Sequence, residues 1–530
     1  MKLQYLKITS PFKNINGIEI KFSTSQGRTV IVGQNGTGKS NIIEALVHIF
    51  KQLESGLPPR FSYQLKYKIG EGDVETWLDI SADKDITDTK AQYQIQYQEY
   101  LNGKPATKWL PVAITKVKRD RAGLSRFLPR NVFAYYSGPS DRLESLFYQA
   151  RKTFYLDVIQ DGADFRDNIR PFFYAKPFHS QFALLALFAA RGFPKALRFL
   201  EKELCISSFE SATFVLKKPD WGSNDATDFW GASGAIREFL ELIKQHCIGP
   251  IETQEPIPGQ LSKRVKNRTV VSYFLPHKKQ LDLFTKNMRP DVFFKFLEAS
   301  YLSGILERVK VEVKQTKSHQ NVEFTQLSEG EQQLLTIVGL LQFTAKQDAL
   351  FLLDEPDTHL NPNWAAKYHR FLDIFVPDEF RSHIVMTTHH PLSIAELEKE
   401  QIQVVKRDEN TQQVSVSTPD KSPRGMNVNG ILTSDMFGLL TTLDNETQAL
   451  IRERKKLVVE ENDPERLNEL NTQLEQLGYG YIHPDEDYRQ FLIARSKYLE
   501  YGQEVASVEA RKQMIKNILK DMKVSPDEIR

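Results

Sequence analysis

Eight residues near the N-terminus have the types and spacing needed to hold a chain of phosphates. The run Gly33-Gln34-Asn35-Gly36-Thr37-Gly38-Lys39-Ser40 fits the pattern G-x-x-x-x-G-K-[ST]. Glycines let backbone N–H groups approach phosphate oxygens, and a helix that begins at this point adds the positive end of its dipole. In this pattern Lys39 reaches the β and γ phosphates and Ser40 ligates Mg²⁺. The loop, together with Asn41, is therefore predicted to bind ATP.

Two acidic residues far along the chain could complete such a site. Asp354-Glu355 follows the apolar run 349–353, which is typical of a buried strand. Asp354 is expected to hold Mg²⁺, and Glu355 to orient or deprotonate the attacking water. His389 follows the next apolar run, 383–388, and is predicted to contact the γ-phosphate. The competing interpretation is that all three are solvated residues at strand ends and in a loop.

A third segment, Leu327-Ser328-Glu329-Gly330-Glu331-Gln332-Gln333, has the pattern of a helix start. Ser328 is a candidate N-cap, and Glu331 stands three residues on as its capping-box partner. A helix N-terminus at which Ser328 and Gly330 are exposed is also an anion site. Because Lys39 already serves the nucleotide of its own chain, this second site is predicted to bind the γ-phosphate held by another subunit.

The elements that must position these residues form an α/β pattern. Residues 29–32 are a continuous apolar run that leads into the glycine loop, and residues 41–50 follow a helical period, so the loop stands between a strand and a helix. Further strands are expected around 76–81, 92–101 and 131–136. The texture from about 150 to 300 is helical and aromatic. After about 425 it is helical again, with leucine spacing interrupted at Pro464, which predicts an antiparallel helical hairpin.

Length and composition set the class of protein. At 530 residues, with 40% apolar and 26% charged residues, several lobes of an ordinary globular protein are expected. The net charge of +2 argues neither for nor against a nucleic-acid partner, and two cysteines outside any paired motif predict neither disulfide nor zinc. The N-terminus has no leader pattern, and the strongest apolar run, 182–190, is half the length of a membrane span and is expected to be a buried helix. A cytoplasmic protein without membrane contact is predicted.

The motifs in this order resemble those of ATP-binding-cassette (ABC) ATPases. Leu327-Ser328-Glu329-Gly330-Glu331 looks like their signature sequence, although Glu329 stands where glycine is usual. The core Asn35–Asn41 and the ending Thr387-Thr388-His389-His390-Pro391 are most similar to the cytosolic branch of chromosome-maintenance, recombination-repair and overcoming-lysogeny-defect ATPases. The resemblance implies a head of mixed sheet around the P-loop that pairs head to head, as a dimer or higher oligomer, around two ATP molecules.

This resemblance predicts how the chain is divided. Residues 1–150 are expected to form the N-terminal half of the head, and 151–305 a mainly helical insertion. Residues 306–425 are expected to form the second half of the head, with the signature, Asp354, Glu355 and His389. Residues 426–530 are expected to form a helical C-terminal region. The glutamine that usually senses Mg²⁺ in the family is not identified; the region 136–139 is a guess.

Softer patterns narrow the resemblance to the PtuA family of anti-phage defence ATPases, found in Septu and some retron systems. These patterns lie at 214–221, 229–232 with 237–240, and 431–439. The resemblance implies an ATPase that acts as sensor and regulatory subunit for a separate HNH-type nuclease of the PtuB kind. A retron reverse transcriptase with its nucleic acid is a further candidate partner.

Alternatives remain open. The chain could be a DNA-repair or recombination ATPase that acts on DNA ends or gaps, or an ATP-gated scaffold with negligible turnover. No nuclease site of its own is expected, because the acidic residues near 460–463 lie within the leucine-spaced hairpin. Two basic stretches could contact phosphate backbones but are more simply explained as solvated surface. They comprise Lys116, Lys118, Arg119, Arg121, Arg126 and Arg130 in the first (116–130), and Lys263, Arg264, Lys266 and Arg268 in the second (263–268).

Overall fold

The computed structural model describes residues 1–22, 27–70, 73–120, 125–159, 170–189, 193–256, 267–344, 348–376, 382–408, 410–460 and 463–477. The chain divides into two compact units, Met1–Leu439 and Leu440–Arg530. The predicted motifs all lie in the first unit. The finer division of that unit into head and insertion stays a prediction.

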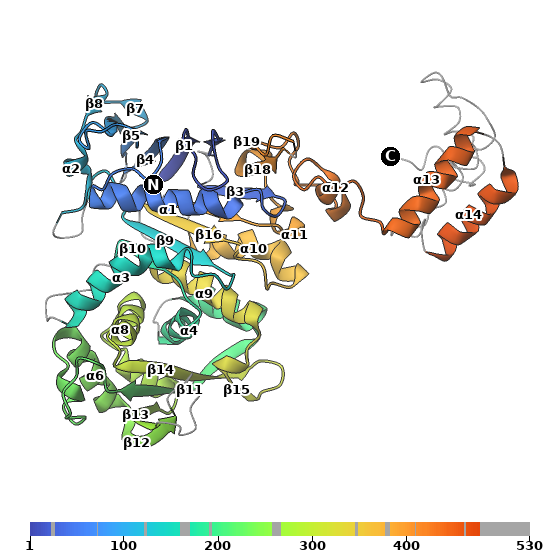
Figure 1. The fold of residues 1–530 in the computed structure, drawn as a ribbon. Helices are drawn as coiled ribbons and strands as arrows, with labels where there is room; N and C mark the ends of the chain where they lie inside the picture. The colour runs from blue at the N-terminus through green and yellow to red at the C-terminus, as the bar shows by residue number, and fades with distance from the viewer. Residues whose placement is uncertain are drawn as a thin grey trace. The chain divides into compact units, whose positions relative to one another are not determined.

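A largely parallel sheet crosses the first unit (Figure 1). Its strand order is β10-β9-β16-β17-β3-β18-β19, and each pair is parallel except β18 with β19. The apolar runs predicted as buried strands are its centre, because parallel strands covered on both faces need apolar residues throughout. The strands are β3 (Arg28–Gly33), β9 (Asn131–Tyr136), β10 (Phe172–Tyr174), β16 (Ala349–Asp354), β17 (His383–Thr387), β18 (Ile402–Arg407) and β19 (Val414–Ser417).

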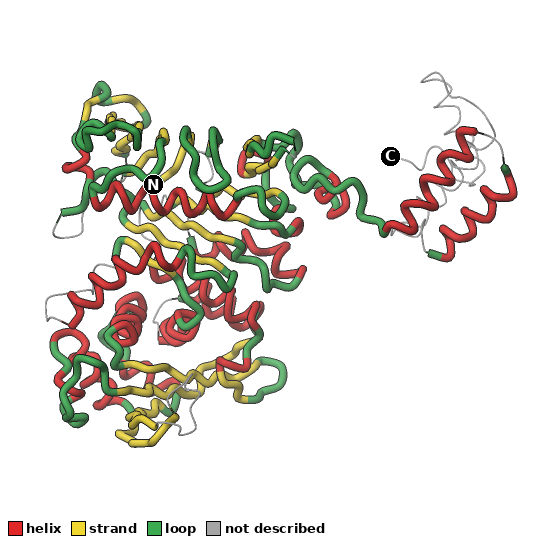
Figure 2. The backbone as a smooth tube through the Cα atoms, viewed as in Figure 1, coloured by secondary structure: helices red, strands yellow, loops and turns green. Residues whose placement is uncertain are grey.

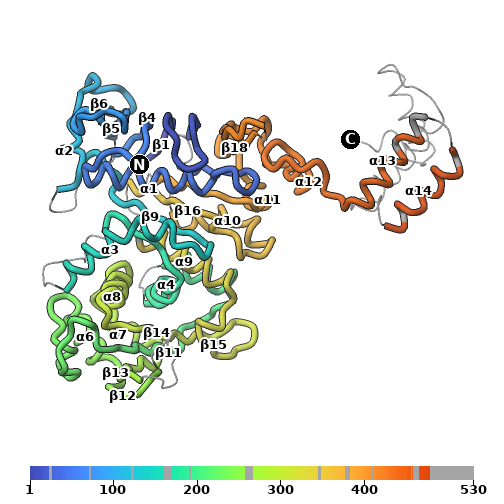
Figure 3. The backbone as a smooth tube through the Cα atoms, in the orientation of Figure 1, coloured from blue at the N-terminus to red at the C-terminus, as the bar shows by residue number. Residues whose placement is uncertain are grey.

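The colours of Figure 3 show how far apart in sequence these neighbours are, since blue β3, teal β9 and yellow-orange β16 lie in one layer. β16 pairs with β9 on one side and β17 on the other, and β17 pairs with β3. The carboxyl ends of these parallel strands therefore meet at one edge of the sheet. In open parallel sheets that edge is where ligands bind.

An antiparallel sheet covers one side of α1 (Lys39–Ser55), and the parallel sheet covers the other. The apolar side chains of α1 belong to one buried cluster with residues of both sheets, among them Leu6, Leu65, Leu350 and Val385. The helix begins two residues earlier than the periodicity predicts. The antiparallel strands are β1 (Lys2–Ile8), β2 (Glu19–Lys21), β4 (Tyr63–Ile69), β5 (Val74–Ala82), β6 (Tyr93–Leu101), β7 (Lys104–Pro105) and β8 (Leu110–Pro111), and α2 (Ile114–Val117) follows them.

The region between the two halves of the motif set contains both helices and a second antiparallel sheet (Figure 2). Its helices agree with the predicted helical texture, but the sheet was not predicted. The longest strand, β11, pairs with β14 through three register shifts, so its sequence lacks the regular alternation that marks a strand. The sheet order is β12 (Ile248–Pro256), β13 (Asn267–Leu275), β11 (Ile206–Lys217), β14 (Leu306–Gln315) and β15 (Asn321–Glu323).

Most helices of the first unit lie on the side of the parallel sheet opposite α1, and among them α6 and α7 contact the second antiparallel sheet. A strand, β10, stands within the segment from about 150 to 300 that was expected to be helical, because its aromatic residues pair with β9. Residues 160–169 and 190–192 of that segment lie outside the described residues. The helices are α3 (Glu144–Ile159), α4 (His179–Ala189), α5 (Pro194–Glu203), α6 (Gly234–His246), α7 (Lys278–Phe284), α8 (Pro290–Leu302), α9 (Glu329–Thr344), α10 (Pro362–Phe375), α11 (Pro391–Ile394) and α12 (Val428–Thr433).

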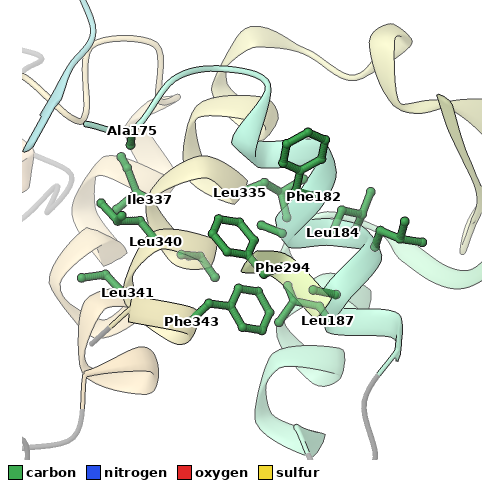
Figure 4. Close-up of a cluster of buried hydrophobic side chains, with 14 of the residues drawn as sticks. Ala175, Phe182, Leu184, Leu187, Phe294, Leu335, Ile337, Leu340, Leu341 and Phe343 are labelled. Atoms are coloured by element: carbon green, nitrogen blue, oxygen red, sulfur yellow. The ribbon is translucent and has the colours of Figure 1, made fainter. Parts of the chain in front are cut away.

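The apolar run expected to be a buried helix is α4, which packs between α8 and α9 (Figure 4). Phe182 and Leu187 of α4 lie beside Phe294 of α8 and residues of α9 such as Leu335, and all of these side chains are buried. α9 is the helix that begins after Ser328. The predicted anion site therefore lies at the end of a helix that packs against α4 and α8. In the part of the chain that the structure describes, no helix combines the length and apolarity needed to cross a bilayer.

The second unit contains the predicted helical hairpin, formed by α13 (Asn445–Glu460) and α14 (Pro464–Gln476). Arg466 forms an ion pair of 2.9 Å with Glu453, and Arg454 donates a 2.6 Å hydrogen bond to Asn471. Leu470 and Leu474, from the leucine-spaced series, are buried. Antiparallel pairing of the two helices explains these cross-links.

Candidate nucleotide-binding site

The predicted phosphate loop connects β3 to α1, and its glycines are required by the backbone. A Cβ on Gly33 would lie 2.2 Å from the carbonyl oxygen of Val405 in the neighbouring strand. Gly38, the residue before the helix, has φ of 104°, in the left-handed region, and a Cβ there would lie 2.9 Å from Oδ1 of Asn14. The sequence folds here into a tight loop whose end opens directly onto the helix N-terminus.

Lys39 folds back over this loop. Its Nζ donates hydrogen bonds of 2.8 Å to the carbonyl oxygen of Gly33 and 3.1 Å to that of Gln34. Burial lowers the pKa of the Lys39 ammonium, and the nearby carboxylates of Glu355 and Asp354 oppose that shift. A buried cation whose hydrogen bonds go to carbonyl oxygens gains strongly from a further anionic partner. Lys39 is therefore placed to receive phosphate oxygens.

The loop is braced by a residue that sequence reasoning missed, Asn14. Its Nδ2 donates to the carbonyl oxygen of Gly36 at 3.1 Å, and its Oδ1 accepts from Nδ2 of Asn41 at 2.6 Å. The predicted nucleotide-binding residue Asn41 thus contacts the loop through Asn14. No motif marks Asn14, because it lies in a turn before β2 whose only link to the loop is spatial.

The structure brings Asp354, at the end of β16, against the start of α1. The residue is buried, and its Oδ1 accepts hydrogen bonds from the hydroxyls of Ser40 (2.9 Å) and Thr387 (2.6 Å). Its Oδ2 accepts from Nη2 of Arg142 at 3.1 Å. Burial raises the pKa of Asp354 above its usual range, and the two hydroxyls and the arginine charge oppose the rise. Neither Thr387 nor Arg142 was among the predicted site residues.

The donor set at Asp354 fits Mg²⁺. A buried carboxylate and a serine hydroxyl are hard oxygen ligands, and Mg²⁺ with a nucleotide needs few protein ligands because water and phosphates supply the rest. Ser40 and Asp354 would hold the ion, which when bound would offset the charge of the phosphates. Away from this pair, no group of three or more His, Cys, Asp or Glu side chains within the described residues is arranged to hold a metal.

Glu355 and His389 form an ion pair beside Asp354. Nδ1 of His389 lies 3.4 Å from Oε1 of Glu355. This contact holds the pKa of Glu355 below its usual range and raises the pKa of His389. Glu355 has φ of 52°, and its N–H donates to the carbonyl oxygen of Thr387 at 3.2 Å, so the local backbone aims the side chain. The arrangement keeps an ionised carboxylate that can orient or deprotonate a water.

The loops after β16 and β17 are tied together by hydrogen bonds. Thr388 donates its hydroxyl to Oδ2 of the buried Asp357 at 2.7 Å, and the same hydroxyl accepts from the N–H of His390 at 2.9 Å. Burial raises the pKa of Asp357. These bonds fix the chain on both sides of His389, which was predicted to report the γ-phosphate.

The segment predicted as a second anion site begins α9 with the expected capping box. The N–H and hydroxyl of Ser328 both donate to Oε2 of Glu331, at 2.7 and 2.8 Å. Ser328 is exposed, but the expectation that Gly330 is exposed is wrong: it is buried, and a Cβ there would lie 2.5 Å from the carbonyl oxygen of His359. Glycine is needed at 330 for close packing. An open pocket at this helix end is lined by Glu203, Leu204, Cys205, Ser328, Glu329, Gly330, Glu331, His359, Asn361 and Trp364.

Much of the predicted basic surface is neutralised within the chain. Arg119 pairs with Glu54 at 3.1 Å, and Arg126 and Arg268 form ion pairs with Glu99 and Glu307. Lys116, Lys118 and Arg130 are exposed. Arg121, Lys263, Arg264 and Lys266 lie outside the described residues.

Comparisons with known proteins agree with a P-loop ATPase. Residues 10–145 match the family described as "AAA domain", and residues 251–395 match "AAA domain, putative AbiEii toxin, Type IV TA system". The first match holds the phosphate loop, and the second holds Ser328, Asp354, Glu355 and His389. The two family matches thus cover the two halves of the site.

Two curated relatives are similar to the chain. The "Septu protein PtuA" of Bacillus mycoides (strain KBAB4) is 30% identical over 125 residues, which are 22% of this chain but only 17% of that protein. The "Retron Vc95 probable ATPase" of Vibrio cholerae serotype O1 biovar El Tor is 19% identical over 469 residues, 83% of this chain and 80% of that protein. The crystal structure of Stu0660 of Streptococcus thermophilus aligns with 99% of this chain and 96% of that chain at 12% identity, with a TM-score of 0.25, too low to inform the fold. The chain thus matches AAA-domain family models over two separate segments, 10–145 and 251–395, and it is similar to PtuA of Septu and to a retron ATPase.

Proposed function

We propose that the protein binds ATP with Mg²⁺ and hydrolyses it, with Lys39, Ser40 and Asp354 holding the nucleotide and metal and with Glu355 and His389 acting on the attacking water and the γ-phosphate. The observation that carries this proposal is the contact between Ser40 and Asp354, with the Glu355–His389 pair beside it. Each of these groups stands where charge must be placed or neutralised during phosphoryl transfer.

The site becomes complete when two chains pair. Ser328 lies at the exposed start of α9, and the N-terminus of a helix, where the dipole is positive, suits an anion. The proposed assembly is an ABC-type head-to-head dimer, or a higher oligomer built from such dimers, in which the α9 start of one subunit meets the ATP of the other. The order of the motifs along the chain supports this arrangement.

The proposed biological role is regulation of a separate effector in bacterial anti-phage defence, in the cytoplasm. The similarity to the Septu protein PtuA and to a retron ATPase supports it. The proposed partner is an HNH-type nuclease of the PtuB kind, with a retron reverse transcriptase and its nucleic acid as a second candidate. Exposed Lys116, Lys118 and Arg130 are candidates for contact with nucleic acid.

Replacing Glu355 by Gln tests the proposal, because it keeps the shape and removes the base. Glu355→Gln should bind ATP·Mg²⁺, lose hydrolysis, and accumulate as a species of at least twice the 61.1 kDa chain in mass photometry. Lys39→Ala, which removes a phosphate contact, is the matched control and should keep the mass that it has without nucleotide. Hydrolysis by Glu355→Gln at the normal rate would show that another group is the base. A steady-state ATPase assay with and without DNA separates a regulatory ATPase from a DNA-stimulated repair enzyme.

A further inference from the structure

Arg142 occupies the one carboxylate oxygen of Asp354 that the hydroxyls leave open. Oδ1 already accepts from Ser40 and Thr387, and Nη2 of Arg142 lies 3.1 Å from Oδ2. The side chain of Asp354 is 2% exposed and that of Arg142 is 33% exposed. The guanidinium therefore reaches a buried anion from the solvent side, where it can leave without unpacking the core.

A guanidinium and Mg²⁺ repel each other when both bind this carboxylate. Arg142 carries a fixed positive charge and offers only donors, so it cannot serve as a metal ligand. A divalent cation held by Ser40 and Asp354 would stand beside this guanidinium, and like charges at short range repel. Without a metal, the positive charge of Arg142 balances the negative charge of Asp354. A bound metal ion would have the same effect.

We propose that Arg142 and Mg²⁺ bind Asp354 in competition, so that arrival of Mg²⁺ with the nucleotide releases Arg142 from the site. This inference rests on the proposed function, because it takes Asp354 as the metal carboxylate. Arg142 is a positioning residue in this scheme: it acts through Asp354 and sets how strongly the site favours metal-bound nucleotide over metal-free nucleotide.

Release of Arg142 would change the position of the start of α3, which begins two residues after Arg142. The hydroxyl of Ser145 donates to the carbonyl oxygen of Arg142 at 2.9 Å, and the N–H of Ser145 donates to the carbonyl oxygen of Asp141 at 2.8 Å. Glu144, in the first turn, forms ion pairs with Lys176 (2.5 Å) and Arg151 (2.9 Å). α3 packs on β10 and α8. Movement of Arg142 therefore pulls on a helix that leads from the metal site into the region between the two motif halves.

The side chain of Arg142 also contacts an aromatic ring beside the site. The guanidinium carbon of Arg142 lies 5.1 Å from the ring centroid of Tyr136, the last residue of β9. Tyr136 remains available to the arginine after it leaves Asp354. Release from Asp354 then needs a side-chain rotation of Arg142 and not an unfolding of the loop.

The test compares the affinity for a fluorescent ATP analogue, MANT-ATP, in saturating Mg²⁺ and in EDTA. In Arg142→Ala the metal no longer has to displace a cation, so the ratio of the two dissociation constants (EDTA over Mg²⁺) should rise by roughly tenfold relative to the unchanged protein. Arg142→Gln, which keeps the length but not the charge, should shift the ratio in the same direction. Arg151→Ala is the control, because it removes an arginine from α3 that pairs with Glu144 and not with Asp354.

Hydrogen exchange gives a second readout that does not depend on turnover. Addition of Mg²⁺·MANT-ATP should change amide protection in the first turn of α3 in the unchanged protein, and this change should be smaller in Arg142→Ala. Equal or lower dissociation-constant ratios in both Arg142 variants, or an α3 whose exchange does not respond to Mg²⁺·nucleotide, would overturn the inference. Absence of MANT-ATP binding by the unchanged protein would instead overturn the proposed function itself.

Discussion

The hydroxyl of Ser40, at the start of α1, donates a 2.9 Å hydrogen bond to the carboxylate of Asp354, which stands 314 residues further along the chain at the end of β16. The contact exists because β16 and β3 lie in one parallel sheet with β17 between them. Their carboxyl ends face the same edge. The intervening segment contributes β9 and β10 to the same sheet and Arg142 to the site.

Removal of the Lys39 ammonium should weaken nucleotide binding without lowering the stability of the fold. Lys39→Met loses a charged contact to phosphate, so the affinity for MANT-ATP·Mg²⁺ should fall by about tenfold or more. Because burial already disfavours this ammonium, the nucleotide-free variant should unfold at a temperature no lower than that of the unchanged protein. Fluorescence titration and thermal unfolding measure the two effects. Unchanged affinity would remove Lys39 from the site.

Mixing two inactive variants tests whether Ser328 acts on the ATP of a second subunit. Lys39→Ala removes nucleotide binding, and Ser328→Arg blocks the start of α9. Each alone should lack ATPase activity. In mixed dimers one composite site keeps an intact Lys39 from one subunit and an intact Ser328 from the other, so an equal mixture should recover roughly a quarter of the normal rate.

The same mixture shows whether Ser328 acts on the nucleotide of its own chain or on that of the other subunit. If Ser328 served the nucleotide of its own chain, no pairing of these variants would contain a complete site, and the mixture would stay inactive. Mixing Lys39→Ala with Glu355→Gln, both of which act on the nucleotide of one chain, is the matched control and should give no recovery from sites that need both residues.

His383 predicts acid sensitivity of the first unit. Its Nδ1 accepts from the N–H of Leu3 at 2.9 Å and its Nε2 contacts the hydroxyl of Thr29 at 3.1 Å, so it joins β17 to β1 and is neutral. Burial lowers its pKa from 6.5 to about 3. A lowered folded pKa means that stability is complete above pH 6.5, where the unfolded chain is also neutral, and is lost as pH falls toward 3. Between pH 7.5 and pH 5 the loss is about 2 kcal/mol.

Urea unfolding at these two pH values, followed by tryptophan fluorescence, measures this loss in the first unit, which contains all five tryptophans. In His383→Asn the side-chain oxygen can still accept from Leu3 but does not titrate. The loss of stability between the two pH values should then be smaller by about 2 kcal/mol. An equal loss in both proteins would mean that His383 titrates alike in the folded and unfolded chain.

Gly339 predicts a tight crossing of α9 and α4. A Cβ at this position would lie 2.0 Å from the Cβ of Ala183. Gly339→Ala gains about 1 kcal/mol of helix propensity but should still lower the free energy of unfolding, because overpacking costs about 1–3 kcal/mol. Adding Ala183→Gly restores the space, so the double variant should show a favourable coupling in a double-mutant cycle. A more stable single variant would mean that the helices can separate at no cost.

Local patterns along the chain predicted much of the site. Gly33 to Ser40 were recognisable because phosphate binding needs a short loop between a strand and a helix, and all its parts are neighbours in sequence. Asp354 and Glu355 were recognisable because a fully buried parallel strand is a continuous apolar run. The hairpin of α13 and α14 followed from leucine spacing and a proline. Each of these signals is local, so no long-range contact was needed to find it.

Asn14, Arg142 and Thr387 were not recognisable, because nothing next to them in sequence shows what they touch. Asn14 braces the phosphate loop from a turn before β2, and Arg142 reaches Asp354 from the start of α3. Gly330 was expected at the surface and is buried, since the backbone of His359 from another loop covers it. β11 was missed because register shifts against β14 break its alternation.

The sequence by itself determined which chemical groups are present and that a glycine loop, a helix and buried strands would carry them. Tertiary structure alone decided that Ser40, Asp354 and Arg142 meet at one point. The physical reason is that parallel pairing aligns strand ends from distant parts of the chain. Side chains at the shared edge then come close enough to form hydrogen bonds and ion pairs. A single buried carboxylate, shared by two hydroxyls and a guanidinium, is the result.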